Sequence, residues 1–359
     1  MTYNICLLPG DGIGPEVIAE AKKILRVLPI EFKFTSGKIG YNAYQEIGTP
    51  LPDETLQLVE KADATLFGAV TTPPNIPNYF SAIIRLRQTF DLYSNLRPCR
   101  SFNHSSSQPD IDLLVVRENT EDLYSGVERV EDGGNRAISE RIITRKASER
   151  ILRKAFELAR QRGETKVTVV HKANVLRESD GLFRKVALEV APYYSDILME
   201  EMLVDTCAME LVRAPEQFDV IVTTNLFGDI LSDEASMLVG GLGVACSGNI
   251  GDKVAVFEPV HGSAPNIAGQ NKANPTATLL STVMLLEYLG EIEHARHLRL
   301  AIENCIEDGD VTADMGGCLL TQQMTVKVIE SLKIYYPYLA SARTHNPTVE
   351  ATFEKVDRR

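Results

Sequence analysis

The chain has 359 residues, of which 37 are basic and 49 acidic, so its formal charge is −12. Hydrophobic residues make up 44% and charged residues 24%, proportions that exclude a largely disordered protein. A negatively charged chain lacks the basic field that binds a phosphate backbone, so nucleic acid is not expected as a partner. The length predicts roughly two domains, because single cores stop growing at about 250–300 residues.

The chain shows no sign of a membrane or secreted protein. No window approaches the roughly 18 consecutive apolar residues of a membrane helix, and the N-terminus lacks the basic start of a signal peptide. The six cysteines are scattered without a CxxC pair, which predicts buried thiols in a reducing compartment. We therefore expect a cytoplasmic protein that does not bind membranes.

Short apolar runs alternate with longer amphipathic stretches, a pattern that predicts an α/β fold. The expected strands cover 3–8, 64–70, 111–116, 166–170 and 220–224, and the expected helices begin near Glu16 and cover 277–289 and 291–304. Residues 101–110 and 240–251 resemble loops that cross between domains. The polar segment 128–141, with Gly133-Gly134 at its middle, predicts a projecting hairpin.

The most distinctive local feature is a pair of aspartates, Asp229 and Asp233, that follows an expected strand. The two are four residues apart, so on a helix their carboxylates share one face. Close like charges repel each other, and oxygen ligands favour Mg²⁺ or Mn²⁺. A metal site and a solvated acidic helix face are both compatible with this pattern.

Four arginines, Arg85, Arg87, Arg97 and Arg117, form a second feature. Several arginines that converge on one pocket suit a di- or tricarboxylic acid, which they bind through bidentate pairs. Each arginine taken singly is also compatible with an ordinary surface position. Arg117 is the most informative, because it directly follows an apolar run.

Two further residues are candidates for proton transfer. Lys172 follows the expected strand at 166–170, and beside a metal it is a candidate general base. Tyr124 lies seven residues beyond Arg117 and is a candidate acid. A lysine that only extends its charge to solvent, and a half-buried tyrosine, are the alternative interpretations.

A tight polar loop at 258–269 is able to wrap a nucleotide through its backbone groups. The early glycines Gly10, Gly12 and Gly14 are spaced GxGxG rather than GxGxxG, so a standard Rossmann site is not expected. The pair His294 and His297 is interpreted as an exposed helix face rather than a metal site.

Taken together, seven segments resemble motifs of the β-decarboxylating dehydrogenase family, which includes isocitrate, 3-isopropylmalate and homoisocitrate dehydrogenases. In family order they are LPGDGIGPE, DLYSNLRP, VRENTEDLYSG, HKANVL, TTNLFGDILSD, GGLGVACSGNIGD and EPVHGSAPNIAGQNKANPTA. They span nearly the whole chain, and their shared order is far more specific than any one of them.

The resemblance implies an α/β, isopropylmalate-dehydrogenase-like fold with two doubly wound domains and the active site in the cleft between them. Residues 1–98 and 240–359 would form a discontinuous large domain that binds the nucleotide. Residues 99–239 would form a small domain with metal and substrate residues and a dimerisation arm near 128–141. The expected assembly is a homodimer, or a tetramer made of two such dimers, with shared active sites.

The resemblance also implies a role for individual residues. Tyr124 would be the acid, and Lys172 the base, contributed across the dimer interface. Asp229, Asp233 and the neighbouring subunit's Asp205 would bind Mg²⁺ or Mn²⁺. The substrate would contact Ser81, Ile83, Ile84, Arg87, Arg97, Arg117 and Asn174, and the cofactor would contact Thr72, Glu258, His261, Gly262, Ser263, Ala264, Pro265, Asn266, Ile267 and Asn274.

The implied reaction is oxidation of a 2-hydroxy acid at C2, loss of its 3-carboxylate as CO₂ and return of a proton to carbon. Members that use NADP are expected to carry Lys-Tyr after HGTAP, and members that use NAD usually carry Asp-Ile. Here Asn266-Ile267 follows HGSAP, which favours NAD but removes the charge that repels a phosphate.

The helix that would read the substrate contains Ser81, which isocitrate enzymes share, and Ile83 and Ile84, which match isopropylmalate enzymes. The stretch TTPPNIPNYFSAI and the overall spacing are closer to homoisocitrate dehydrogenases, some of which carry an arginine in place of Ile84. The order of preference is homoisocitrate, isocitrate and 3-isopropylmalate. A non-catalytic regulatory subunit is the alternative of another class, although such a subunit is expected to have lost catalytic residues that this chain keeps.

Overall fold

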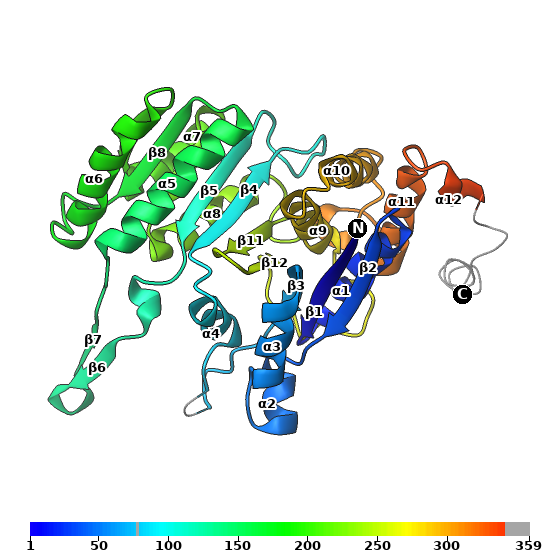
Figure 1. The fold of residues 1–359 in the computed structure, drawn as a ribbon, viewed down its shortest axis with the longest axis horizontal. Coiled ribbons are helices and arrows are strands. Elements are labelled where there is room, and N and C mark those ends of the chain that lie inside the picture. The colour runs from blue at the N-terminus through cyan, green and yellow to red at the C-terminus, as the bar shows by residue number, and fades with distance from the viewer. Residues whose placement is uncertain (77–78, 342–359) are drawn as a thin grey trace. The chain divides into compact units, whose positions relative to one another are not determined.

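The computed structural model describes residues 1–76 and 79–341, which form two compact units (Figure 1). The first unit contains Met1–Thr71, Phe102–Ser105 and the described residues from His261 to Ser341, and the second contains the described residues of Thr72–Ser101 and Ser106–Val260. Both mix helices with strands, so the predicted α/β class is confirmed. Residues 72–98 and 240–260, which the sequence placed with the chain's ends, group with the second unit because their strands extend its sheet.

The first unit is built on three parallel strands in the order β2-β1-β3. These are β1 (Thr2–Gly10), β2 (Glu31–Ser36) and β3 (Ala64–Ala69). Its helices are α1 (Gly14–Val27), α2 (Tyr41–Ile47), α3 (Asp53–Lys61), α9 (Thr276–Tyr288), α10 (Ile292–Glu307), α11 (Thr321–Leu332) and α12 (Tyr338–Ser341). Helix α9 is apolar on nearly every side and packs against α1, α10 and β3, so it forms the centre of this unit's core.

The second unit has a seven-stranded sheet in the order β12-β11-β4-β5-β10-β8-β9. Its strands are β4 (Ser94–Arg100), β5 (Asp112–Glu118), β8 (Lys166–His171), β9 (Leu198–Leu203), β10 (Val220–Thr223), β11 (Cys246–Ile250) and β12 (Ala255–Pro259). The pairs from β5 to β9 are parallel, and those among β4, β5, β11 and β12 are antiparallel.

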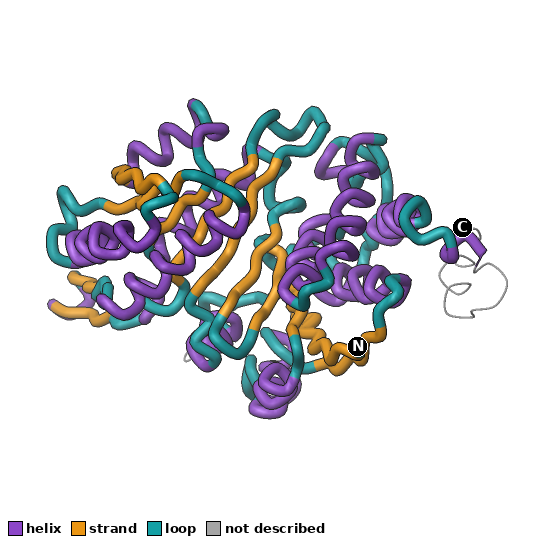
Figure 2. Tube along the Cα trace, turned by 45° about the horizontal axis from the view of Figure 1, so that its top comes forward, coloured by secondary structure: helices purple, strands orange, loops and turns teal. Residues whose placement is uncertain are grey.

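Helices cover both faces of the parallel part of this sheet (Figure 2). Helices α5 (Arg145–Arg162) and α6 (Ser179–Val190) pack on one face, and α7 (Val204–Arg213) and α8 (Asn225–Leu238) pack on the other. Alternate residues of β5 face the two cores: Leu114 and Val116 face α5 and α6, whereas Leu113 and Val115 face α7 and α8. Burial on both faces explains why the strands read as continuous apolar runs.

A two-stranded hairpin extends from the second unit, as the sequence predicts (Figure 1). It consists of β6 (Glu128–Glu131) and β7 (Arg136–Ser139), joined by a turn at Asp132–Gly134. Both turn glycines have positive φ angles, 63° at Gly133 and 100° at Gly134, which other residues rarely adopt. The remaining helix of this unit is α4 (Ala82–Thr89).

Most of the expected elements are present, but three interpretations are wrong. Cys246–Ile250, expected within a crossing loop, is the buried strand β11, because its small polar residues pair with two neighbouring strands. Cys318 is exposed, although the other five cysteines are buried thiols. His294 and His297 are half-buried, because both bond to the hydroxyl of Tyr336. None of the described helices is long and apolar enough to cross a membrane.

The core between α5 and the sheet gives a test of packing. Phe156 is fully buried and stacks on Tyr194 with ring centroids 5.0 Å apart. Phe156→Ala is expected to lower the free energy of unfolding by about 3–5 kcal/mol, because it removes apolar area and leaves a cavity. Val130→Ala in the hairpin, at a side chain 69% exposed, is the control. Urea denaturation should show a change within about 0.5 kcal/mol for the control, and a similarly small loss for Phe156→Ala would contradict this packing.

Candidate active site

The two predicted metal ligands, Asp229 and Asp233, lie on one face of α8, just beyond strand β10. Both are bonded to Arg97 of β4, whose Nη2 donates to Asp229 Oδ1 at 3.0 Å and whose Nη1 donates to Asp233 Oδ1 at 2.7 Å. Arg117 of β5 also donates to Asp229 Oδ1. We call these four residues the carboxylate–arginine cluster.

Arg117 is the most deeply buried charged residue of the cluster, with 1% of its side chain exposed. Asn225, the first residue of α8, accepts bonds from its Nε at 3.0 Å and its Nη2 at 2.7 Å. Burial lowers the pKa of Arg117 to about 10, and the neighbouring Arg97 contributes in the same direction. The guanidinium therefore remains charged at neutral pH, oriented by an amide and neutralised by a carboxylate.

The arginines control the ionisation of the two aspartates. Burial alone would raise the pKa of Asp229, but Arg117 and Arg97 outweigh that effect and hold the pKa below its usual value. The part of the Asp233 side chain that is shielded from water raises its pKa, against the opposing influence of Arg97. Asp229 is thus an ionised oxygen donor, and Asp233, with its side chain 51% exposed, is open to solvent.

Tyr124 joins the same cluster from a short 3₁₀ turn, Leu123–Ser125. Its hydroxyl donates to Asp229 Oδ2 at 2.5 Å, and its ring lies 5.0 Å from the Arg117 guanidinium. Burial, together with the hydrogen bond to Asp229, raises the pKa of Tyr124 above its usual value. The hydroxyl therefore holds its proton at neutral pH, which suits a proton donor.

Arg87, on α4, is buried and bonded to a carboxylate of its own. Its Nη2 donates at 2.8 Å to Glu258 Oε1, which also accepts a bond from Asn249 at 2.7 Å. Among the described residues, the buried Nε of Arg87 has no hydrogen-bond partner. An unsatisfied buried donor is costly unless a ligand supplies the acceptor, so this atom indicates an anionic ligand.

The residues predicted to read the variable arm of the substrate lie on the same helix as Arg87. Ser81 occupies the N-cap position of α4, and Ile83 and Ile84 are half-buried in its first turn. Ile83 and Ile84 are four and three residues before Arg87, so they share its side of the helix. Arg85 is exposed and lies over the ring of Phe80 at 5.2 Å.

Lys172 and Asp205 form a separate ion pair, in which Lys172 Nζ donates to the carboxylate of Asp205. Asp205 lies in the first turn of α7 and is 60% exposed, and its bond from Lys172 lowers its pKa. Asn174, two residues beyond Lys172, is exposed. Among the described residues, no three His, Cys, Asp or Glu side chains are grouped to hold a metal ion, so Asp205 does not join Asp229 and Asp233 within one chain.

The donor chemistry of α8 nevertheless fits a hard divalent cation. Asp229 and Asp233 present carboxylate oxygens four residues apart on one helix face, and oxygen donors are those that Mg²⁺ and Mn²⁺ prefer. Two carboxylates leave most positions of an octahedral ion open, so a third protein ligand and a substrate have room to bind.

The predicted cofactor loop is held by the turn that follows β1. Ile13 N–H donates to the carbonyl of Ser263 at 2.9 Å, and the hydroxyls of Ser263 and Thr71 bond at 2.6 Å. Asn266 is exposed at the surface of the loop, whereas Ile267 packs against Ile13.

The other predicted cofactor residues differ in exposure. Thr72 and Gly262, Ala264 and Pro265 are exposed, whereas His261 is half-buried. Asn274 is buried, donates to Asp314 at 3.0 Å and accepts from the N–H of Thr276, the first residue of α9. In the structure its side chain is therefore engaged in fixing the start of that helix.

The chain matches the model of a known protein family. The family model described as isocitrate/isopropylmalate dehydrogenase matches residues 4–332. The chain belongs to this family. Its members are oxidative decarboxylating dehydrogenases, and the family in general depends on NAD(P) and a divalent metal ion. They act on small carboxylic acids and are typically oligomeric.

Individual relatives carry different substrate names. The isocitrate/homoisocitrate dehydrogenase of Thermus thermophilus is 48% identical over 93% of this chain and 99% of its own. The 3-isopropylmalate dehydrogenase of Methanothermobacter thermautotrophicus is 47% identical over 92% of this chain and 99% of its own. The crystal structure of isocitrate dehydrogenase from Methylococcus capsulatus has a TM-score of 0.89 at 43% identity, covering 92% of this chain and 99% of that one.

Two acidic residues, which the sequence did not predict to be functional, anchor loops near the predicted cofactor site. The carboxylate of Glu16, in the first turn of α1, accepts the N–H groups of Gly269 and Asn271. Asp11 accepts three backbone N–H groups, from Tyr41, Asn42 and Thr71, at 2.7–2.8 Å. The early glycine-rich motif of this family member therefore holds loops in place, and acidic residues inside the motif were the only signal of that role.

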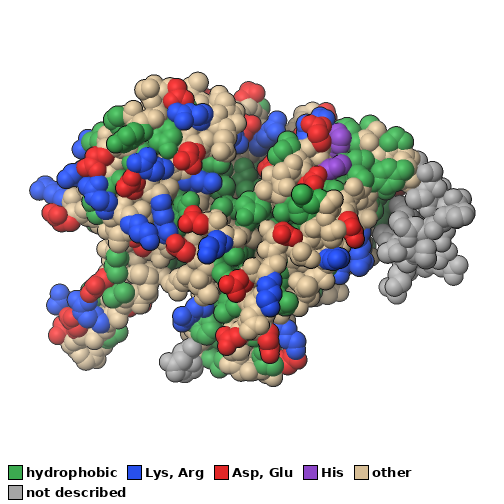
Figure 3. Space-filling model, viewed as in Figure 1, with side chains coloured by type: hydrophobic (Ala, Val, Ile, Leu, Met, Phe, Trp, Pro, Cys, Tyr) green, Lys and Arg blue, Asp and Glu red, His purple; other side chains and the backbone are tan. Residues whose placement is uncertain are grey.

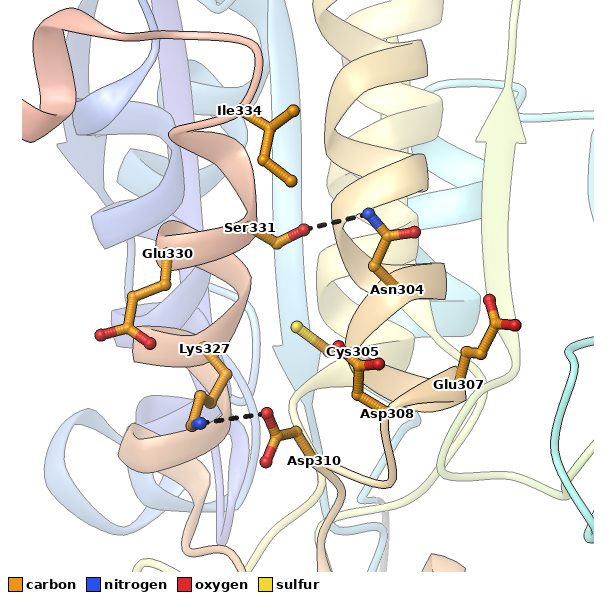
Figure 4. A pocket seen from close by; sticks show the side chains of 9 residues that line it. All are labelled: Asn304, Cys305, Glu307, Asp308, Asp310, Lys327, Glu330, Ser331 and Ile334. Atoms are coloured by element: carbon orange, nitrogen blue, oxygen red, sulfur yellow. Dashed lines mark hydrogen bonds and ion pairs between the residues drawn. The ribbon is translucent and has the colours of Figure 1, made fainter.

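Away from this cluster, a hollow of about 330 Å³ lies between α10 and α11 (Figure 4). Two pairs of its polar side chains bond to each other: Lys327 Nζ binds Asp310 at 3.1 Å, and Asn304 donates to Ser331 at 3.2 Å. Burial raises the pKa of Cys305 to about 12, so its thiol is not a nucleophile.

On the face shown in Figure 3, acidic and basic side chains are interspersed rather than gathered into a basic patch.

Glu121, which lies next to the cluster, is expected to make the stability of the folded chain depend on pH. Its carboxylate accepts bonds from the N–H and hydroxyl of Thr144, both at 2.8 Å, and its carbonyl accepts from Asn225. Burial raises the pKa of Glu121 from 4.5 to about 7, against the effect of those bonds. Between these two values the folded chain binds more protons than the unfolded chain, so this carboxyl group lowers stability as pH rises.

Glu121→Gln removes this titration and should stabilise the chain relative to wild type progressively as pH rises. The melting temperatures of both proteins, measured from about pH 5 to about pH 8, should diverge up to about pH 7 and then remain parallel. A difference that stays constant across the range would contradict the raised pKa.

Proposed function

We propose that this protein is an NAD- and metal-dependent enzyme that converts homoisocitrate to 2-oxoadipate, CO₂ and NADH. Isocitrate is the second candidate substrate and 3-isopropylmalate the third. The observation that carries the proposal is the convergence of Arg97, Arg117 and Tyr124 on the carboxylate of Asp229. It combines binding groups for carboxylates, a hard metal ligand and a proton donor in one cluster.

The arginines supply recognition of the acid. Arg87, Arg97 and Arg117 are each at most 9% exposed, so their charges act where water screens them little. Planar guanidinium groups bind carboxylates through paired hydrogen bonds. The unpartnered Nε of Arg87 supports this assignment, because a substrate carboxylate would satisfy it.

Two side chains would move the protons of the reaction. Lys172 would accept the proton of the 2-hydroxyl as C2 is oxidised, and Tyr124 would return a proton to C3 after CO₂ leaves. When bound, NAD accepts the hydride from C2 and the divalent ion polarises the oxygen on that carbon. Tyr124 keeps its proton until that step because burial and Asp229 raise its pKa.

The groups to be bound also have proposed sites. Asp229 and Asp233 would hold the Mg²⁺ or Mn²⁺ together with a second copy's residue equivalent to Asp205. The loop from Glu258 to Ile267, with Asn274 and Thr72, would hold NAD. The exposed amide of Asn266 is able to bond ribose hydroxyls, but unlike a carboxylate it does not repel a phosphate.

A second copy of the chain would complete the site. The Lys172–Asp205 pair and the carboxylate–arginine cluster are separate groups within one chain. Helices α7 and α8, which carry Asp205 and Asp229, also expose large apolar side chains that a partner would cover. They are Met209, Val212, Ile230 and Met237, each 57–64% exposed. A homodimer, alone or paired into a tetramer, is therefore the proposed assembly. The proposed location is the cytoplasm.

The first test compares kcat/KM for homoisocitrate, isocitrate and 3-isopropylmalate, each with NAD⁺ and with NADP⁺ in the presence of Mg²⁺, by absorbance of the reduced cofactor. Homoisocitrate with NAD⁺ should lead by about 10-fold, corresponding to roughly 1.4 kcal/mol of preferential transition-state binding. A preference for 3-isopropylmalate would instead mean that Ile83 and Ile84 determine which substrate the pocket accepts. Turnover of none of the three acids would refute the proposed activity.

A second test mixes two inactive variants. Lys172→Met removes the base, and Asp233→Asn removes a metal ligand, so each homodimer should form little NADH. After unfolding and refolding together, mixed dimers contain one intact site and should restore about 25% of wild-type activity, because random pairing makes half of the dimers mixed. Asp233→Asn mixed with Asp229→Asn is the matched control, which lacks any intact site. If neither mixture regained activity, Lys172 and Asp233 of one chain would belong to the same active site, and the shared site would be refuted.

A further inference from the structure

A single guanidinium, that of Arg141, joins three segments of the second unit. Arg141 lies just beyond β7 of the hairpin, and 13% of its side chain is exposed. Its Nε donates to Asp122 Oδ1 at 2.7 Å, its Nη1 to Asp180 Oδ1 at 2.6 Å and its Nη2 to Thr224 Oγ1 at 2.7 Å. The side chains of Asp122 and Asp180 are fully buried.

One of these partners, Asp180, also bonds to the backbone of the proposed base, Lys172. The other carboxylate oxygen of Asp180 accepts the backbone N–H of Lys172 at 2.5 Å. Lys172 follows strand β8, and Asp180 lies in the first turn of α6. The bond between Arg141 and Asp180 therefore fixes the backbone from which the Lys172 side chain extends.

The other partners lead to the proposed acid and to α8. Asp122 accepts the N–H of Leu123 at 2.9 Å, at the start of the turn that carries Tyr124. Its second oxygen accepts the N–H of Leu226 at 3.1 Å in the first turn of α8. Thr224 is the N-cap residue of that helix. Arg141 thus also fixes the turn of Tyr124 relative to the helix of Asp229.

The geometry requires an arginine rather than any cation. A guanidinium presents donors on three nitrogens in one plane, and here all three are used: Nε and Nη2 both donate to Asp122, Nη2 also donates to Thr224, and Nη1 donates to Asp180. Its plane also lies against Phe227, with the guanidinium carbon 4.5 Å from the ring centroid. A lysine ammonium keeps the charge but is a single point, so it cannot hold three acceptors in this arrangement.

We propose that Arg141 is a positioning residue that serves both active sites of the dimer. It holds the Lys172 that one chain contributes to its partner's site and the Tyr124 that the chain keeps for its own. This inference rests on the proposed function and its shared site. Among the described residues, the side chains that accept from Arg141 bond onward to the backbone beside Tyr124, to the start of α8 and to Lys172, and not to Arg87, Arg97 or Arg117. We therefore expect its effect to fall on proton transfer rather than on carboxylate binding.

A dimer with one intact site allows the two effects to be separated. One chain carries Lys172→Met and the other Asp233→Asn, with different affinity tags for purification of the mixed dimer. The intact site then uses Lys172 from the Asp233→Asn chain and Tyr124 from the Lys172→Met chain. Arg141→Lys is added to one chain or to the other. Arg145→Lys is the control, since Arg145 pairs with Glu189 where both side chains are nearly half exposed.

Two partial reactions report on the two positions. The first-turnover rate of NADH formation depends on Lys172, and exchange of the C3 protons of the 2-oxo product in D₂O depends on Tyr124. Arg141→Lys in the chain that supplies Lys172 should slow the first by about 10- to 100-fold, and in the other chain it should slow the second to the same extent. The KM for the hydroxy acid should shift by less than about 3-fold in both, and Arg145→Lys should change neither rate.

The inference would be overturned if Arg141→Lys slowed the two reactions to the same extent whichever chain carried it, or if it slowed neither reaction. Asp180→Asn provides a second route if the Arg141 variant does not assemble: it should slow NADH formation only in the chain that supplies Lys172, and an effect independent of the chain would also overturn it. Failure of the proposed function is distinguishable, because wild type would then turn over none of the three acids. Failure of the shared site would show as a mixed dimer that is inactive before Arg141 is changed.

Discussion

Two buried guanidinium groups on neighbouring antiparallel strands, those of Arg97 and Arg117, make the carboxylate of Asp229 the centre of this structure. A charge removed from water is tolerated only when it is paired and hydrogen-bonded, and one buried charge left alone is strongly destabilising. The requirement favours one rotation of α8 about its own axis, in which the face that carries Asp229 and Asp233 points toward the two arginines. It also sets the position of Tyr124, whose hydroxyl binds the remaining oxygen of the same carboxylate. Groups suited to binding an acid and donating a proton are therefore held by the interaction that neutralises the buried arginines.

The sheet of the second unit makes this arrangement possible. Helices on both faces bury nearly all of the parallel strands β5, β8 and β10, so the charged side chains of the site lie at the strand ends and on the helices that follow them. Arg117 lies at the end of β5, Lys172 follows β8, and α8 follows β10. Helices α7 and α8 pack on the same face, yet Asp205 of α7 bonds to Lys172 rather than joining Asp229. Division of the functional groups into two sets within one chain is consistent with sites completed by a second copy.

Some of this organisation was predictable because it depends on local patterns. The strands and helices were recognisable from apolar periodicity, the hairpin from Gly133-Gly134, and the shared face of Asp229 and Asp233 from their spacing alone. Other features depended on contacts that no local pattern contains. Cys246–Ile250 looked like a glycine-rich loop but is a buried strand, because strands on both sides supply its hydrogen bonds. No local pattern marks Arg141, Asp122 and Asp180 as partners, because they are distant in the sequence and meet only when the chain folds. Glu16 likewise gains its role from a loop more than 250 residues away.

The sequence by itself determined the fold class, the membership of the family and the residue types available for the chemistry. These follow from hydrophobic periodicity and from ordered motifs, both of which are properties of the chain in one dimension. Only the tertiary structure decided which charges neutralise one another: that Arg97 bridges two aspartates, that Lys172 pairs with Asp205, and that one donor of Arg87 is left without a partner among the described residues. The physical reason is that the ionisation of a buried group and the orientation of a side chain depend on neighbours within a few ångströms. Those neighbours come from strands and helices that the sequence places far apart.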